Sequence, residues 1–241
     1  MRLDKFLSIT GTASRSDAKK AIRAKAVSVN NTVAKSGDMQ IDPKCDKVFF
    51  HGAEILYREH TYIMMNKPDG VVSATDDGRD KTVIDLLSQN IQNNKLFPCG
   101  RLDKNTLGLI LITDDGDLAH ELLSPKSHVE KIYKFKSADP ISLNDAKLFE
   151  EGLTLADGYQ TLPAKIELFD SRDEGFITLK EGKYHQIKRM LGALNNKIIY
   201  LERVSFGPLK LDRNLQRGEW RYLTEEEEQL LRNHKTTLIG D

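Results

Sequence analysis

The stretch Gly100-Arg101-Leu102-Asp103-Lys104-Asn105-Thr106-Leu107-Gly108, followed by the apolar run Leu109-Ile110-Leu111-Ile112, places one carboxylate in a turn bounded by two glycines. Glycine permits positive φ and close approach of neighbouring backbone, and the run that follows is typical of a strand. We therefore expect Asp103 at a strand end facing a cleft, where a carboxylate can act as acid, base or nucleophile. On local chemistry alone, an Asp that only hydrogen-bonds its own turn is the commoner alternative.

Three further motifs accompany this stretch in a set order. Asn66-Lys67-Pro68-Asp69-Gly70 precedes it, and Glu130-Lys131-Ile132-Tyr133 and Gly182-Lys183-Tyr184-His185-Gln186-Ile187-Lys188-Arg189-Met190 follow it. The four motifs together resemble the signature of the RNA pseudouridine synthases that act on ribosomal RNA, within which the chain is similar to the small-subunit (16S) branch. The resemblance covers nearly the whole chain. It implies isomerisation of a specific uridine to pseudouridine in 16S rRNA, of the pseudouridine-516 type.

The resemblance implies three catalytic residues, Asp103, Tyr133 and Lys188. Asp103 would either add covalently to the nucleoside or deprotonate its sugar, and both routes stay open. Tyr133 would pack against the target base, although aromatic residues in strands are usually core. Lys188, three positions after His185, would hold Asp103 ionised through its opposite charge. Some related branches carry Arg at that position, so this partner is a feature of the branch.

A second set of residues is expected to contact RNA. Lys67 has two interpretations, a structural lysine or one that faces RNA, and His185 is expected to bind RNA or donate hydrogen bonds and not to act as an acid or base. The set comprises Arg2, Arg15, Lys19, Lys20, Arg23, Lys67, Arg101, Thr106, His185, Gln186 and Arg189.

Charge is unevenly distributed along the chain, although the 241 residues have a formal net charge of zero. Residues 1–35 carry eight Lys and Arg against Asp4 and Asp17, a net charge of +6, and residues 36–241 carry 28 basic and 34 acidic residues, a net charge of −6. A basic module on a mildly acidic body indicates a polyanionic partner. Here that partner is expected to be 16S rRNA in a small-subunit assembly intermediate.

The first 55 or so residues resemble an S4-type RNA-binding domain. A short helix is expected at 2–7, and Ser14 with Asp17 three residues later predicts the start of a second helix. Lys19, Lys20 and Arg23 lie on one stripe of that helix, and Asn30-Asn31 predicts a hairpin turn. A merely solvated basic face is the alternative for the stripe.

The expected fold class is α+β: a small S4-like module followed by a catalytic domain with a mixed, mainly antiparallel sheet. The predicted boundaries are 1–56 for the module, 57–60 for a linker, 61–232 for the catalytic domain and 233–241 for a frayed tail. Within the catalytic domain we expect a strand at 71–73 and helices at 82–87 and 141–155, with Thr224 and Glu227 capping a final helix.

Composition excludes several other classes. The 39% hydrophobic content and the absence of an apolar run of about 18 residues predict no membrane span, and no secretory signal is visible. The sequence has no P-loop, G-x-G-x-x-G unit or Cys/His cluster, so we expect no metal and no cofactor. With only Cys45 and Cys99, both expected to be reduced thiols, we expect a cytoplasmic location. We also expect a monomer.

Three alternative functions stay open: a pseudouridine synthase acting on 23S rRNA, a non-catalytic S4-type RNA-binding assembly factor, and a carboxylate-dependent hydrolase. The factor would not need both Asp103 and Lys188. The hydrolase would commonly need a second catalytic carboxylate, for which we find no motif.

Overall fold

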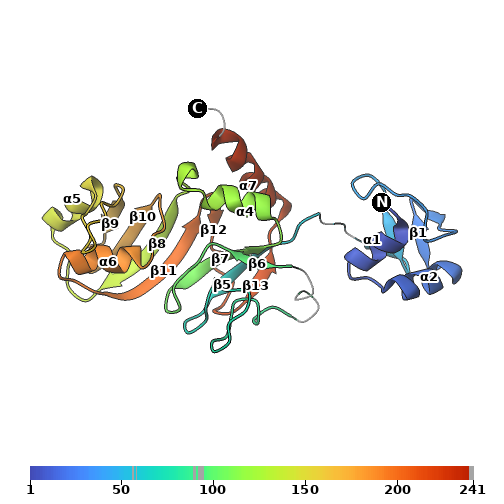
Figure 1. The fold of residues 1–241 in the computed structure, drawn as a ribbon, viewed down its shortest axis with the longest axis horizontal. Helices are drawn as coiled ribbons and strands as arrows, with labels where there is room; N and C mark the ends of the chain where they lie inside the picture. The colour runs from blue at the N-terminus through green and yellow to red at the C-terminus, as the bar shows by residue number, and fades with distance from the viewer. Residues whose placement is uncertain (56, 58, 89–90, 92–94, 239–241) are drawn as a thin grey trace. The chain divides into compact units, whose positions relative to one another are not determined.

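The computed structural model describes residues 1–55, 57, 59–88, 91 and 95–238. The chain divides into two compact units, Met1–Glu59 and His60–Asp241. Both units contain helices and strands (Figure 1). Among the described residues, no helix combines the length and apolar character that crossing a bilayer requires.

The N-terminal unit packs two helices against a four-stranded antiparallel sheet with strand order β2-β1-β3-β4. The Ser14 side chain accepts a hydrogen bond from the Asp17 amide, which confirms the predicted cap, and Asn30 and Asn31 have the positive φ expected for the hairpin turn. The core is formed by apolar side chains such as Phe6. The elements are α1 (Leu3–Ile9), α2 (Arg15–Arg23), β1 (Val27–Val29), β2 (Thr32–Val33), β3 (Val48–Phe50) and β4 (Ala53–Ile55).

The second unit is built on one large sheet with the order β13-β5-β7-β11-β8-β10-β9, to which β6 and β12 add at β7 and β11. Only the β7–β11 pair is parallel among the strands described, so the sheet is mixed and mainly antiparallel, as predicted. The strands are β5 (Tyr62–Lys67), β6 (Phe97–Cys99), β7 (Leu107–Thr113), β8 (Lys131–Ser137), β9 (Lys165–Leu168), β10 (Glu174–Leu179), β11 (Ile198–Phe206), β12 (Leu209–Lys210) and β13 (Trp220–Tyr222).

Helices cover both faces of this sheet (Figure 1). Along β7, Leu109 and Leu111 pack with residues of α4 (Gly116–Leu123) and α7 (Glu225–Leu238). Ile110 and Ile112 belong to the opposite core, with residues of α5 (Leu143–Glu151) and α6 (Gln186–Ala193). A strand buried on both faces needs a continuous apolar run, which explains the sequence of β7. A short 3₁₀ helix, η1 (Pro125–Ser127), follows α4.

The sheet forks along β7. At its start, β7 pairs with β11 through Leu107 and Gly108, and at its end it pairs with β6 through Leu111 to Thr113. Gly108 has φ of 96°, and a Cβ there would lie 2.3 Å from the carbonyl oxygen of Arg203 on β11, so only glycine permits this approach. The loop that connects β6 to β7 therefore leaves the sheet where the neighbour of β7 changes from β6 to β11.

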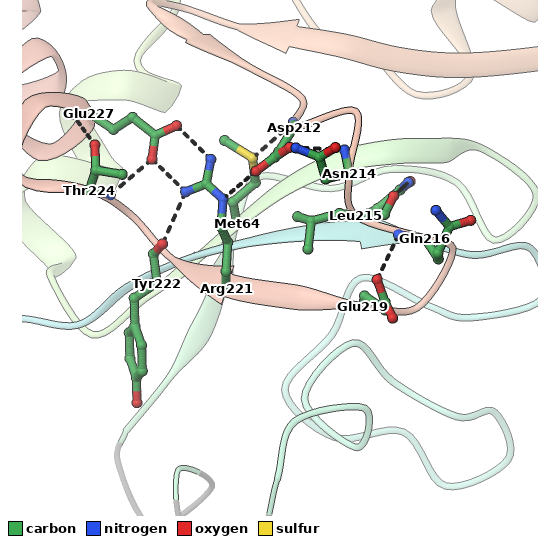
Figure 2. A network of polar contacts seen from close by, with 11 residues as sticks. Met64, Asp212, Asn214, Leu215, Gln216, Glu219, Arg221, Tyr222, Thr224 and Glu227 are labelled. Atoms are coloured by element: carbon green, nitrogen blue, oxygen red, sulfur yellow. Dashed lines mark hydrogen bonds and ion pairs between the residues drawn. The ribbon is translucent and has the colours of Figure 1, made fainter.

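A cluster of charges joins the last strand to the last helix (Figure 2). The Arg221 guanidinium donates two hydrogen bonds to Glu227, at 2.6 and 2.8 Å, and one to Asp212 at 2.7 Å. Glu227 also accepts from the Thr224 amide and Thr224 accepts from the Glu227 amide, which confirms the predicted capping box. The two carboxylates raise the pKa of Arg221, with hydrogen bonding to Glu227 as the largest cause.

Some predicted elements are wrong. Residues 71–73 form no strand; Val72 makes one isolated parallel bridge to Thr82. Residues 82–87 form turns instead of a helix. Asp85 and Thr82 do make helix-cap hydrogen bonds, but the backbone pairing with Val72 holds the segment extended at its start, and residues 83–87 form turns and a bend.

Two predicted helix boundaries also need correction. α5 spans Leu143–Glu151, a shorter helix than the predicted 141–155. α7 continues to Leu238, whereas the predicted domain ended at 232 and a frayed tail was expected to follow; residues 239–241 lie outside the described residues. Leu56 and Arg58, around the predicted linker, also lie outside them.

Candidate active site

The loop that carries Asp103 connects β6 to β7, and the side chains of Ser73 and Lys67 hold its backbone through hydrogen bonds. The Ser73 hydroxyl donates to the Leu102 carbonyl and accepts from the Leu102 amide, both at 3.0 Å. The Lys67 ammonium donates to the carbonyls of Lys104 and Thr106, both at 2.9 Å, and to that of Pro68 at 3.1 Å. These contacts hold the loop backbone at both ends, so the Asp103 side chain has a defined position.

Lys67 is fully buried, which corrects its assignment as an RNA contact. Burial lowers the pKa of Lys67 to about 8, and the negative charges of Asp69 and Asp103 oppose that shift. The structural interpretation of this lysine is the correct one, because its ammonium is surrounded by loop carbonyls.

The side chain of Asp103 lies between two basic residues from α6 and its N-cap. Lys188 Nζ is 2.7 Å from Asp103 Oδ2, and His185 Nε2 is 3.6 Å from Asp103 Oδ1. The carboxylate is 24% exposed and the Lys188 side chain 33% exposed, so the ion pair is partly desolvated yet open to a ligand. Asp103 is thus not an Asp that only hydrogen-bonds its own turn.

These groups line one pocket in the second unit. Tyr133, only 8% exposed, contributes from β8, and the predicted residues Arg101, Thr106, His185, Gln186 and Lys188 also line it. Apolar side chains from the strands complete the wall, notably Leu179 and Leu201. A pocket with an aromatic ring, apolar walls and one carboxylate suits a planar base held beside a reacting sugar.

Two predicted RNA contacts have other partners, and a third is buried. Gln186 is 4% exposed; its side chain accepts from the Lys183 amide and donates to Glu181. Thr106 lines the pocket but is only 1% exposed. Arg189 pairs with Asp157 at 2.5 Å and is not among the lining residues. Of the two adjacent cations on α6, Lys188 contacts Asp103 and Arg189 does not.

The predicted RNA contacts of the N-terminal unit lie on its surface. Arg15, Lys19, Lys20 and Arg23 are exposed on α2, and Lys20 pairs with Asp17 at 3.0 Å. Arg2 makes two hydrogen bonds to the buried carboxylate of Asp4, at 2.7 and 3.0 Å. Hydrogen bonding to Arg2 lowers the pKa of Asp4. The charge of Arg2 is thus partly committed within the unit.

Several residues of the site were missed from the sequence. Ser73 was assigned only to a predicted strand at 71–73, and its contact with Leu102 depends on long-range folding. Leu179 and Leu201 read as ordinary strand core, so no local signal marks them as pocket walls. Lys183 and Tyr184 lie inside the fourth motif, but only residues that follow Tyr184 in that motif were predicted to contact RNA or to take part in catalysis.

The sequence matches two family models. Residues 61–193 match the model described as RNA pseudouridylate synthase, and residues 1–47 match the S4 domain. The first match spans more than half of the chain and contains Asp103, Tyr133 and Lys188.

The chain belongs to the RNA pseudouridine synthase family.

Full-length relatives agree with this placement. An uncharacterized RNA pseudouridine synthase of Bacillus subtilis is 46% identical, over 96% of this chain and 98% of its own length. Ribosomal small subunit pseudouridine synthase A of Vibrio cholerae is 45% identical, over 94% of this chain and 97% of its own. A crystal structure of a pseudouridylate synthase is 40% identical and superposes with a TM-score of 0.68, covering 96% and 99% of the two chains. The pseudouridine synthase is therefore an isomerase with an S4 domain, as predicted.

Proposed function

We propose that this pseudouridine synthase converts one uridine of 16S rRNA, of the pseudouridine-516 type, and that Asp103 is its essential carboxylate. The supporting observation is the pocket itself, in which Asp103, Lys188 and Tyr133 converge although they come from a loop, a helix and a strand. The 16S assignment is supported by similarity to relatives named as ribosomal small-subunit enzymes.

The reaction moves atoms within one nucleotide. The bond between uracil N1 and the sugar C1′ breaks, the base turns, and C5 bonds to C1′; C5 loses a proton and N1 gains one. Asp103 either adds to the nucleoside or removes a proton from the sugar, and Lys188 supplies the opposite charge beside it. Tyr133, with the apolar walls, holds the flipped base.

The S4 unit is proposed to dock the enzyme on a small-subunit assembly intermediate. Its exposed cations on α2 support this role. We further propose that the enzyme acts as a monomer in the cytoplasm, where the free thiols Cys45 and Cys99 suit a reducing compartment.

Replacement Asp103→Asn tests the catalytic assignment. The amide keeps the size of the side chain but can neither accept a proton as a base nor act as a carboxylate nucleophile, so we expect single-turnover conversion to be lost. RNA affinity should stay near that of the wild type. Chemical labelling specific for pseudouridine measures conversion, because the isomers have equal mass.

Asp80→Asn is a matched control. Asp80 also pairs with a lysine, Lys104 at 2.7 Å, but it is not among the residues that line the pocket. We expect it to retain activity. Comparable conversion by the Asp103→Asn protein would contradict the assignment.

Mapping pseudouridine in a strain that lacks the protein tests the substrate. We expect one site to disappear from 16S rRNA and to return when the wild-type gene is restored. A site missing from 23S rRNA, with 16S rRNA unchanged, would overturn the substrate while leaving the reaction intact.

A further inference from the structure

An aromatic side chain stands open to solvent beside the pocket. Tyr184 is 71% exposed, the largest exposed fraction among the large hydrophobic side chains that the structure describes. Its chain neighbours on both sides, Lys183 and His185, line the pocket. Scattered exposed hydrophobic residues are normal on protein surfaces, so its surroundings decide whether this one has a role.

Tyr184 is stacked on His185. The ring centroids are 3.8 Å apart and the ring planes differ by 20°. His185 has φ of 50°, the left-handed region, which turns the chain at the start of α6. Because His185 covers one face of the tyrosine ring and most of the side chain is exposed, the other face is available to a planar ligand. His185 Nε2 lies 3.6 Å from Asp103, so the stack leads outward from the catalytic carboxylate.

The segment that presents the stack is held in place before any ligand binds. Gln186 accepts from the Lys183 amide at 2.9 Å and donates to Glu181 at 2.6 Å. The same carboxylate accepts from the Tyr159 hydroxyl at 2.6 Å, and Lys183 Nζ lies 5.0 Å from the centre of the Tyr159 ring. A platform ordered in advance loses little conformational entropy on binding.

The chemistry around the stack favours RNA over an apolar protein partner. Arg101, Lys183 and Lys188 line the adjoining pocket, so phosphates passing the rim meet positive charge. A uridine that enters the pocket must leave its stack, and the neighbouring base then loses a stacking partner. An exposed aromatic face can replace that partner for any base.

We propose that the Tyr184–His185 stack is a binding site for the nucleobase next to the target uridine in the RNA strand. This inference rests on the reaction assigned to the pocket and is independent of which ribosomal RNA is modified. The Tyr184–His185 stack holds the strand open while the uridine occupies the pocket. The enzyme gains RNA affinity because the neighbouring base, which base flipping would leave unstacked, stacks on Tyr184.

The test compares Tyr184→Ala, Tyr184→Leu and Tyr184→Phe with the wild type. Ribosomal RNA from cells that lack the protein, both subunits included, is the substrate, and single-turnover conversion is measured against enzyme concentration. We expect Ala and Leu to raise the half-saturating enzyme concentration by roughly 5- to 100-fold and Phe to stay close to the wild type. The rate at saturation should change much less.

Phe169→Ala is the matched control, since Phe169 is 41% exposed, follows β9 and is not a pocket residue. It should leave half-saturation unchanged. Once the modified site is mapped, 2-aminopurine placed on either side of the uridine gives a direct readout. Its fluorescence should be quenched on one side by the wild type and by Tyr184→Phe, and not by Tyr184→Ala.

Four results would overturn the proposal: unchanged half-saturation for Ala, equal losses for Phe and Ala, Leu behaving like Phe, or a lower saturating rate with unchanged half-saturation. The second points to the hydroxyl, the third to plain apolar contact and the fourth to His185 geometry. Failure of the 16S assignment is recognised separately, because the wild type then modifies only the large-subunit RNA and the comparison among variants still holds. An unfolding transition matching that of the wild type shows that each variant is folded.

Discussion

Single residues decide the chemistry of this site, and neighbours in sequence have different roles. Lys188 and Arg189 are adjacent on α6, yet Lys188 contacts Asp103 and Arg189 contacts Asp157 outside the pocket. The Asp103–Lys188 pair is partly exposed, so its contribution to stability is small. Its proposed importance is chemical, because it puts a positive charge beside Asp103, the proposed essential carboxylate.

Lys188→Met should lower the single-turnover rate by roughly 100-fold, the usual order for loss of one preorganised charged group at a reacting centre. RNA affinity should fall much less. Arg189→Met removes a cation one position away and should leave the rate near that of the wild type. Equal effects of the two replacements would show that α6 acts only through general positive charge.

Cys99 makes stability depend on pH. The thiol is fully buried, and burial raises its pKa to about 12. In the unfolded chain the thiol ionises near pH 9, so above that pH the unfolded state binds fewer protons than the folded state, and stability falls as pH rises towards 12. The limiting slope is about 1.4 kcal/mol per pH unit.

Cys99→Ala should remove this slope, measured as the difference in unfolding free energy between variant and wild type from pH 8 to 11. A difference in unfolding free energy that stays constant across that pH range would contradict a raised pKa for the Cys99 thiol. As a control on accessibility, a thiol reagent should modify one cysteine, the exposed Cys45, in the native protein and two after denaturation.

Elements were predicted from sequence where local chemistry determines them. The caps at Ser14 and Thr224 and the turn at Asn30-Asn31 depend on hydrogen bonds and φ values within a few residues. The helix expected at 82–87 failed because backbone pairing with Val72, ten residues before Thr82, overrides the local cap. The pocket walls were not predicted for the same reason, since Leu179 and Leu201 come from separate strands and meet only in the folded chain.

Replacing Gly108 tests whether the pairing of β7 with β11 depends on close backbone approach at this residue. Gly108→Ala would put a Cβ 2.3 Å from the Arg203 carbonyl oxygen at a φ of 96°. We expect a loss of about 3–5 kcal/mol in unfolding free energy, from backbone strain together with overpacking. Activity should fall too, because the separation of β7 from β11 displaces the loop that carries Asp103.

Gly192→Ala is the contrasting replacement. Gly192 lies in α6, and a Cβ there meets no atom within 4 Å among the described residues. Replacement should leave stability unchanged or raise it by up to about 1 kcal/mol. Chemical denaturation of both variants measures the contrast, and similar losses for the two would contradict the account of the fork.

At the scale of the whole molecule, the basic charge belongs to one compact unit. The first 35 residues have a net charge of +6, and Lys19, Lys20 and Arg23 are exposed on α2. Charge segregation was visible in the sequence because it needs only counting.

Replacing Lys19, Lys20 and Arg23 together by Gln should flatten the dependence of log affinity on log salt concentration by roughly two to three units, since each phosphate neutralised contributes about −0.7 to −0.9. Conversion at saturating enzyme should change little. An unaltered slope would show that the stripe is only a solvated face or binds protein. A collapsed rate with intact binding would mean that α2 shapes the catalytic cleft.

The strand order also determines when this enzyme becomes complete during its own synthesis. β11, which pairs with both β7 and β8, and β13, which pairs with β5, lie late in the chain. At about 5–20 residues per second, a ribosome needs roughly 8–30 s to extend the chain from the end of β5 to the end of β13. Until β11 has been synthesised, β7 and β8 each present an unpaired edge, and β5 does so until β13 has been synthesised. The N-terminal sheet closes within the first 55 residues, so the nascent chain carries a finished basic module well before it carries a working enzyme.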